Sequence, residues 1–224
     1  MPYLLIGEGY TVTGLVRRNE HAEQIKSSRA SCVSGDWNNK DTITKQVLKH
    51  DIAFHTATAD HLPSVEAVLD GVKQPAQRGE TTVFIHTSGT IVLDDCAEGK
   101  SKSDKVYHDD MRQETDGVPD GAPHREIDLA IVRAQQKLGE QAKIAIMIPP
   151  LIYGFNPVHR RLTIYIPTLT RFAIKHGFAA HIGEGLSVES NVHVLDLARA
   201  YITLLHHLEE SKPKQTLANP YFYC

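Results

Sequence analysis

The sequence contains few cysteines and no cysteine motif. Its three cysteines, Cys32, Cys96 and Cys224, show no CxxC spacing and cannot all pair with one another. Disulfide-stabilised scaffolds need paired cysteines, and structural zinc sites need clusters of Cys and His. Although there are 13 histidines, none stands in an HExxH motif or beside clustered cysteines. The sequence therefore predicts free thiols, a cytoplasmic location and no metal site.

Long apolar runs and an excess of basic charge are also missing. No stretch approaches the ~18 apolar residues that span a membrane, and Met1–Ile6 lacks the length and basic flank of a signal sequence. Lys and Arg number 24 against 27 Asp and Glu, which gives a net charge of −3. Nucleic acids and anionic lipids select basic surfaces. We therefore expect a small-molecule partner, and neither a nucleic acid nor a membrane.

Short runs rich in β-branched residues alternate with segments of helical period. The expected strands are Thr11–Val16, Ser31–Ser34, Ile52–His55, Thr82–Thr87 and Lys143–Ile148. The expected helices are Glu20–Ser27, Asp41–Lys49, Pro63–Lys73, Arg125–Gly139, Arg161–His176 and Asp196–Glu210. This alternation predicts an α/β fold with a mostly parallel sheet and right-handed crossovers. Ala97–Pro123 interrupts the alternation and is expected to be a long surface loop.

Two arginines follow the first expected strand. In a doubly wound nucleotide-binding sheet, this position contacts the adenosine ribose of the cofactor. A guanidinium group complements a 2′-phosphate, whereas an acidic residue would accept a bond from the 2′-hydroxyl. Arg17 and Arg18 therefore favour NADP over NAD, the alternative being two solvated charges at a strand end. Asp36, after the second strand, is placed either to accept a bond from an adenine amino group or to close an ordinary Asx turn.

Small and hydroxyl side chains follow the third and fourth expected strands. Thr56 and Ala57 would let a flat ring or a ribose approach the backbone closely. Thr87 and Ser88 stand at the carboxyl edge of the sheet, where open α/β folds bind their ligands. Ser88 is therefore a candidate for a hydrogen bond to a substrate carbonyl or alcohol, although a strand-end cap is the alternative.

Together with two further blocks, these residues resemble the extended, or atypical, short-chain dehydrogenase/reductase family, which includes nucleotide-sugar epimerases. The blocks are Pro149-Pro150-Leu151-Ile152-Tyr153-Gly154 and Ser190–Ala198, and the resemblance runs over nearly the whole chain. It implies a doubly wound, Rossmann-like sheet and an NAD(P) cofactor. The residues that it places near the cofactor are Arg17, Asp36, Ala57, Ser88, Pro149 and Pro150, with Tyr153 nearby.

The glycine-rich turn that grips the pyrophosphate in this family is not in the sequence. Family members open with a strand and a GxxGxxG turn before a helix, whereas Tyr3–Tyr10 resembles the end of that helix. Gly7 and Gly9 have no strand before them and no third glycine after them. The sheet is therefore expected to lack its first strand, between Thr11–Val16 and Ile52–His55, and either two inner edges are left unpaired or the gap closes in an unusual way. We expect a truncated chain that binds NADP(H) weakly or undetectably.

The family's YxxxK pair, in which the tyrosine exchanges a proton and the lysine lowers its pKa, is also missing. The matching place reads His124-Arg125-Glu126-Ile127-Asp128. Histidine exchanges protons near neutral pH, and Tyr107 or Tyr153 would supply a phenol. The candidate catalytic residues are therefore Ser88, His124 and Tyr153, although each also suits a structural role.

Two parts of the chain are expected to differ in role. Residues 1–150 are assigned to an incomplete NAD(P)-binding domain, and residues 151–224 to an incomplete substrate lobe interleaved with it. Asn219–Cys224 resembles the start of a strand-bearing segment of that lobe. The resemblance implies an oxidoreductase or epimerase-like enzyme, often dimeric, that transfers hydride to or from a carbonyl or alcohol. The alternatives are a non-catalytic NAD(P)-binding regulator of the NmrA type and an inactive fragment.

Overall fold

Helices and strands alternate along residues 1–224, all of which the computed structural model describes. The strands are β1 (Thr13–Val16), β2 (Ser31–Ser34), β3 (Ile52–His55), β4 (Thr82–Thr87), β5 (Ala142–Ile148), β6 (Leu151–Tyr153), β7 (Phe155–Asn156), β8 (Arg161–Leu162), β9 (Asn191–His193) and β10 (Tyr221–Tyr223). The α-helices are α1 (Pro2–Gly7), α2 (Asn19–Ser27), α3 (Lys40–Val47), α4 (Leu62–Gln77), α5 (Arg112–Asp116), α6 (Arg125–Leu138), α7 (Tyr165–His176), α8 (Val194–Glu210) and α9 (Pro213–Ala218). None of these helices is both long and apolar enough to cross a membrane.

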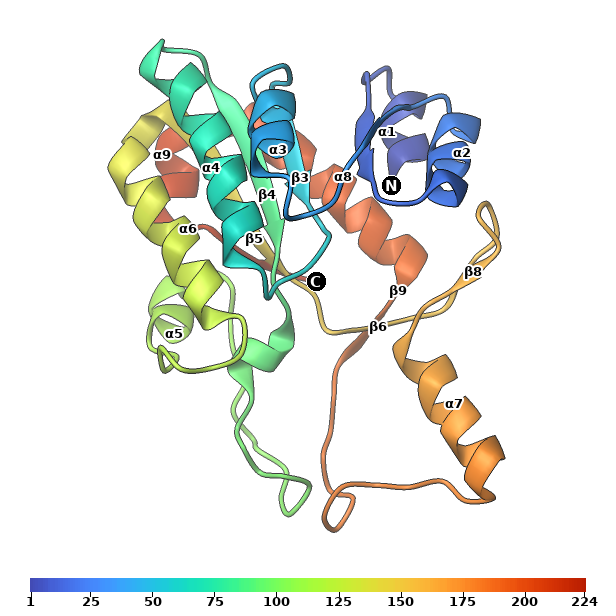
Figure 1. The fold of residues 1–224 in the computed structure, drawn as a ribbon. Helices are drawn as coiled ribbons and strands as arrows, with labels where there is room; N and C mark the ends of the chain where they lie inside the picture. The colour runs from blue at the N-terminus through green and yellow to red at the C-terminus, as the bar shows by residue number, and fades with distance from the viewer.

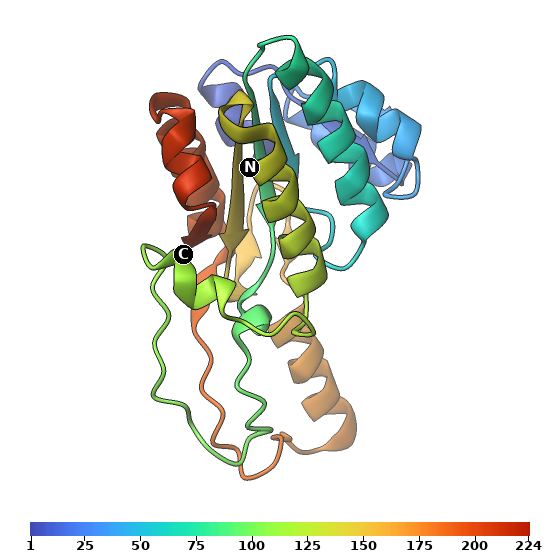
Figure 2. The ribbon, with the colours of Figure 1, turned by 90° about the vertical axis from the view of Figure 1, so that its left-hand side faces the viewer.

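A parallel four-stranded sheet in the order β10-β5-β4-β3 forms the centre of the molecule. Helices α4 and α6 cover one face and α8 covers the other (Figures 1 and 2). Strand β5 is buried along its whole length, as expected for a parallel strand that lies between two helical layers. The predicted doubly wound, mostly parallel α/β fold is therefore confirmed.

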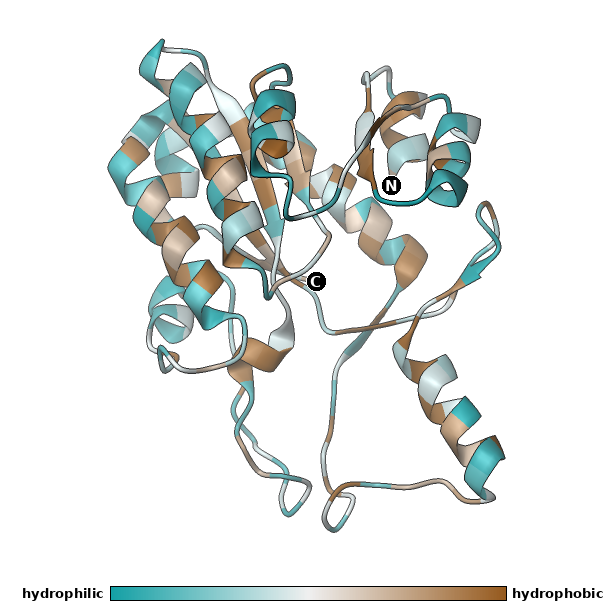
Figure 3. Cartoon of the chain, in the orientation of Figure 1, coloured by the Kyte–Doolittle hydropathy of each residue, from teal (hydrophilic) through white to brown (hydrophobic).

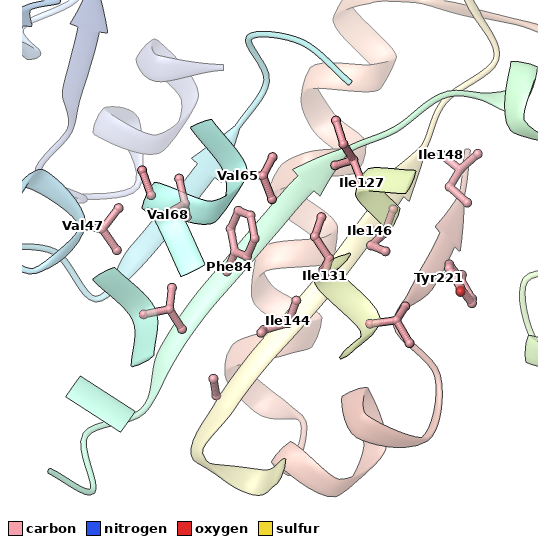
Figure 4. Packing of buried hydrophobic residues seen from close by; sticks show 14 of the residues in the cluster. Val47, Val65, Val68, Phe84, Ile127, Ile131, Ile144, Ile146, Ile148 and Tyr221 are labelled. Atoms are coloured by element: carbon pink, nitrogen blue, oxygen red, sulfur yellow. The ribbon is translucent and has the colours of Figure 1, made fainter. Parts of the chain in front are cut away.

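Two hydrophobic clusters hold the helices to this sheet. Alternate residues of a strand point to opposite faces, so Phe84 and Ile144 pack under α4 and α6, whereas Ile85 and Ala145 pack under α8. Figure 4 shows the first cluster, whose core side chains interdigitate between strands and helices. Each fully buried side chain of this size contributes roughly 1.5–3 kcal/mol.

Close packing of α3 on α4 depends on one glycine. A Cβ built on Gly71 would lie 2.6 Å from the Cβ of Val47, so no larger residue fits without moving the helices apart. This contact joins α3 to the helix layer that covers β3 and β4. It also fixes the position of His50, which follows α3.

Strands β1 and β2 form a separate parallel pair, not part of the central sheet. At their start, Nε2 of His50, just before β3, lies 3.0 Å from Oγ1 of Thr13 on β1. Beyond their ends, the guanidinium of Arg17 lies 5.7 Å from the Trp37 ring, which packs 5.9 Å from the ring of His61. Strands β1 and β3 therefore run in the same direction, and each has one unpaired edge. The two unpaired inner edges predicted from the sequence are present.

This open edge predicts uneven hydrogen exchange in β3. The amide of Val83 on β4 donates to the carbonyl of Asp51, so Ala53 also faces β4, whereas the amides of Ile52 and Phe54 face the gap. Amides without a partner exchange by local opening. We expect those of Ile52 and Phe54 to exchange on the order of 100-fold or more faster than that of Ala53, as measured by NMR. Equal protection of all three amides would show that the gap is closed.

The remaining elements form a loosely packed part beyond the carboxyl edge of the sheet. Strand β6 pairs with β9 in parallel, β7 and β8 form an antiparallel hairpin, and α7 buries none of its residues. Figure 3 shows hydrophobic positions along α7 all the same, and Ile174 is 78% exposed. The long segment after Ala97 reaches this part, because the amides of Glu184 and Leu186 both donate to the carbonyl of Gly99, each at 3.1 Å.

Three details differ from the sequence-based expectation. The segment Ala97–Pro123, expected to be a surface loop, contains helix α5. Arg161–Leu162, expected in a helix, pairs with Phe155–Asn156 as the hairpin strand β8, and α7 begins only at Tyr165. Strand β10, expected in the substrate lobe, instead extends the central sheet beside β5. The reason is burial: Tyr221 is 1% exposed and belongs to the core under α6.

Candidate cofactor and catalytic site

The segments that follow β4 and β5 are tied together at the carboxyl edge of the sheet. The amide of Ser88 donates to the carbonyl of Met147, and the amide of Thr90 donates to the carbonyl of Pro149, at 2.9 and 3.0 Å. Open α/β sheets bind ligands at this edge because the strand ends and helix N-termini leave unpaired groups there. The structure thus brings the chain around Ser88 next to that around Pro149.

A buried carboxyl group holds the hydroxyl of Ser88. Ser88 Oγ donates to Asp128 Oδ2 at 2.8 Å, and the two residues are 6% and 0% exposed. Burial raises the pKa of Asp128 to about 6, although the Ser88 bond and the positive charge of Arg125 act in the opposite direction. The Asp128 carboxyl group therefore changes protonation state close to neutral pH.

His124 lies next to this pair at the N-terminus of α6. Its backbone is left-handed, with φ of 65°, a conformation that non-glycine residues rarely adopt and that is concentrated at functional sites. Its Nδ1 lies 2.7 Å from Oδ1 of Asp60, which belongs to the loop after β3. The opposite edge of the ring faces the residue after Ser88, because a Cβ built on Gly89 would lie 3.6 Å from His124 Nε2.

An open depression lies beside His124. Its volume is about 410 Å³, and both members of the Asp60–His124 pair line it. The other lining residues are Ala59, Asp120, Gly121, Ala122, Glu126 and Ile127. His124 thus borders this depression, whereas Ser88, Gly89 and Pro149 are not among its lining residues.

The residues predicted to bind the adenosine half of a cofactor also lie at strand ends. Arg17 and Arg18 are exposed after β1, and neither forms an ion pair within the chain. Asp36 accepts a 2.8 Å bond from the amide of Asn38, which is the Asx turn that was the alternative for this residue. Thr56 and Ala57 are exposed directly after β3.

Three predicted residues do not join this cluster through their side chains. Thr87 Oγ1 is hydrogen-bonded to the hydroxyl of Tyr201 on α8. Tyr153 packs edge-on against His193, with ring centroids 5.3 Å apart, and shares no hydrogen bond with Ser88 or His124. Pro150 is buried at the end of β5.

Sequence reasoning missed Asp60, the role of Asp128, and Trp37 as the stacking partner of Arg17. Asp128 had a signal, because it lies four residues after His124 and therefore on the same helical face. No sequence signal identified Asp60, because it lies 64 residues from His124 along the chain and only the tertiary structure brings the two together.

An NAD(P) cofactor fits these residues in part. The unpaired arginines suit a phosphate, and the Ser88, Pro149 and His124 cluster suits the nicotinamide end. The pyrophosphate fits less well: Gly7 ends α1, Gly9 follows it, and no strand, glycine-rich turn and helix occur in that order. The residues therefore suit the two ends of such a cofactor but not its pyrophosphate.

A doubly wound sheet with these strand-end residues defines a protein of the dinucleotide-binding α/β class. The family model of the NAD dependent epimerase/dehydratase family matches residues 3–218. The chain belongs to this family.

Comparison with known proteins agrees with this assignment. The chain is similar to oxidase ucsJ of Acremonium, with 30% identity over 209 residues, which is 88% of this chain and 59% of that protein. The chain spans 59–64% of the length of the curated relatives it matches. Its fold is similar to UDP-glucose-4-epimerase from Stenotrophomonas maltophila with bound NAD, at a TM-score of 0.64 and 13% identity over 100% of this chain and 81% of that one. It is also similar to vestitone reductase from alfalfa, at a TM-score of 0.58 and 19% identity over 100% of this chain and 71% of that one.

Proposed function

We propose that this chain forms the core of an NAD(P)-dependent oxidoreductase or epimerase-like enzyme that acts on a carbonyl or alcohol. The observation that carries the proposal is the convergence of Ser88, Pro149 and His124 at the carboxyl edge of the sheet. The nicotinamide, when bound, supplies or takes a hydride. The protein residues then orient the reacting oxygen and move the proton that accompanies the hydride.

Ser88 orients the reacting oxygen, and the protonation state of Asp128 determines whether Ser88 donates or accepts that hydrogen bond. When Asp128 is ionised it accepts the Ser88 hydroxyl hydrogen, so that Oγ is left to accept a bond from an alcohol. When Asp128 is protonated it donates to Oγ, and the Ser88 hydroxyl is free to donate to a carbonyl. Because the pKa of Asp128 is about 6, both arrangements occur within one unit of neutral pH.

The test of this activity is a turnover assay of the chain with reduced nicotinamide cofactors against neutral aldehydes, ketones and nucleotide sugars. Consumption of the cofactor that Ser88→Ala lowers by 100-fold or so supports the proposal. Binding of the cofactor without turnover of any substrate supports a second candidate, an NAD(P)-binding regulator, which the replacement of YxxxK by His124 and Asp128 favours.

For the cofactor we propose NADP, because Arg17 and Arg18 are exposed, unpaired and next to the strand end that meets the ribose. NAD is the cofactor in the solved epimerase complex of similar fold, so the choice rests on these two arginines. Lys45, an exposed cation on α3, serves as the control position.

A 2′-phosphate should therefore strengthen binding of the adenosine half. We expect 2′,5′-ADP to shift the amide signals around Arg17 at roughly tenfold lower concentration than 5′-AMP does, since a charge-assisted contact contributes about 1.5 kcal/mol or more. The double substitution Arg17→Ala and Arg18→Ala should abolish the difference, and Lys45→Ala should preserve it. Equal titration midpoints for the two nucleotides with the unmodified chain would contradict the choice of NADP. Protein-observed NMR measures this even for millimolar binding.

A further inference from the structure

We infer that Asp60 and His124 work as a carboxylate–imidazole pair, in which Asp60 fixes the tautomer of His124 and Nε2 of His124 carries the reacting proton. This rests on the proposed function, because it names the proton donor and acceptor of that reaction. Asp60 is then a positioning residue and His124 a catalytic residue. In a YxxxK pair the catalytic and positioning roles belong to a tyrosine and a lysine, not to a histidine and an aspartate.

The geometry of the pair is specific. Oδ1 of Asp60 lies 2.7 Å from Nδ1 of His124, a short distance typical of a charge-assisted bond. A hydrogen bond also constrains the loop that carries Asp60, since the Asp60 amide donates to Oγ1 of Thr58 at 3.0 Å. The pair therefore joins the loop after β3 to the residue before α6, and both of its members line the depression.

The backbone of His124 is left-handed, as are those of Arg29, Cys96, Glu98 and Arg160, so this conformation alone does not identify a functional residue. His124 keeps this left-handed conformation, which costs about 1 kcal/mol or more for a side chain with a Cβ. Its carbonyl still accepts the first bonds of α6, from Ile127 and Asp128, so the helix itself does not need a histidine there. Glycine or asparagine would take this φ at lower cost.

A carboxylate accepts hydrogen bonds and cannot donate them, so it selects the tautomer of its partner. With Nδ1–H donated to Asp60, the lone pair of a neutral His124 is on Nε2, on the ring edge beside Gly89. In the oxidative direction this lone pair takes the hydroxyl proton of the alcohol. The alcohol's C–H bond breaks as its hydride leaves to an oxidised nicotinamide, and a C=O bond forms.

The reverse direction uses the same atoms. Protonated His124 gives up the proton on Nε2 to the carbonyl oxygen while a reduced nicotinamide delivers hydride to the carbonyl carbon. One C–H and one O–H bond form, the π bond of the carbonyl breaks, and His124 is left neutral with Nδ1–H still bound to Asp60. No further reactant is needed.

The first experiment reads the tautomer directly. Long-range ¹H–¹⁵N spectra of the histidine-labelled chain, with His124 assigned by His124→Gln, should show the Nδ1–H form of His124 at pH values where it is neutral. Asp60→Ala should shift His124 to the Nε2–H form that predominates for free imidazole side chains. Asp94→Ala, which removes an exposed carboxylate after β4 with no side-chain partner, should leave the Nδ1–H form unchanged.

The second experiment uses the reaction. Asp60→Ala should lower kcat by about 100-fold with little change in KM, because proton transfer and not binding is impaired. Asp60→Glu should restore part of the loss, and Asp94→Ala should match the unmodified chain. An unchanged His124 tautomer in Asp60→Ala, or a kcat within about twofold of normal, would overturn the pair. If the unmodified chain shows no turnover while the tautomer responds as expected, the proposed reaction fails and the pair stands.

Discussion

Acidification from pH 7 to pH 4.5 is expected to destabilise this chain through two buried histidines. Nδ1 of His55, on β3, lies 3.2 Å from Nδ1 of His86 on β4, and their rings stack with centroids 5.2 Å apart. Only one proton fits between the two nitrogens. Burial lowers the pKa of His55 to about 4 and that of His86 to about 3, from a usual 6.5. Unfolding therefore takes up protons at any pH between these values.

The sign follows from linkage. Because the folded-state values are depressed, the stabilisation is complete above pH 6.5 and is lost as the pH falls toward 4. Each histidine removes up to about 1.4 kcal/mol from the free energy of unfolding per pH unit within that window. Asp128 opposes this effect, because its raised pKa means that the folded state gains a proton as the pH falls below about 6. Because Asp128 is present in both proteins, a comparison of the unmodified chain with a histidine variant cancels the contribution of Asp128.

Urea unfolding at several pH values measures the effect. His55→Gln keeps a polar group near Ser64, whose Oγ lies 2.9 Å from Nε2 of His55, and removes the titration. Between pH 6 and 4.5, the free energy of unfolding should fall less steeply in this variant, by about 1.4 kcal/mol per pH unit. His181→Gln, at an exposed position, should retain the original slope. Identical slopes for all three proteins would mean that the buried pair does not control acid stability.

Replacement of Arg125 by alanine is expected to cost about 2–5 kcal/mol of folding free energy, from lost packing and lost hydrogen bonds. Arg125 is 1% exposed, and its guanidinium donates to the carbonyl of Asp116 at 3.0 Å and to the hydroxyl of Tyr221 at 3.3 Å. The substitution leaves a cavity and removes one donor to the hydroxyl of Tyr221, which still donates to Oδ1 of Asp116 at 2.8 Å. It also removes a positive charge that lowers the pKa of Asp128, so the Asp128 pKa should rise further.

A second arginine on the same helix provides the control. Arg133 is exposed and has no side-chain partner, so Arg133→Ala should change the free energy of unfolding by no more than about 0.5 kcal/mol. Thermal or urea unfolding of the two variants gives the comparison. A loss below about 1 kcal/mol for Arg125→Ala would show that the buried guanidinium is not needed to hold β10 and α5 to the core.

The positions of strands and helices could be predicted from the sequence because the spacing of apolar residues indicates which residues are buried. The runs at Thr82–Thr87 and Lys143–Ile148 are mainly apolar, which is typical of strands covered on both faces, and they form β4 and all but the first residue of β5. The prediction that Arg161–Leu162 belongs to a helix was wrong, because a segment of two residues is too short to show a helical or strand period. Its strand character comes from pairing with Phe155–Asn156. The placement of β10 depends on tertiary packing of Tyr221, which no local pattern encodes.

The candidate site was predictable only where chain order fixes geometry. Residues directly after parallel strands must meet at one edge, so strand order placed Ser88 at that edge, whereas Pro149 was placed near it only through the family resemblance. The pairing of His124 with Asp60 depends on the loop after β3 and on a left-handed residue at the start of α6. Neither a loop path nor a single unusual φ value can be read from residue types.

The missing neighbour between β1 and β3 has a mechanical consequence. The unit formed by β1, α2 and β2 carries both exposed arginines, whereas His124 and Ser88 belong to the four-stranded unit. Without a continuous ladder of backbone bonds across the gap, the two units are held mainly by side-chain contacts, such as that between His50 and Thr13. Such joints open at lower free energy than sheet interiors do. A ligand long enough to contact both units would therefore hold them in one relative orientation, and its binding should reduce the motion between them.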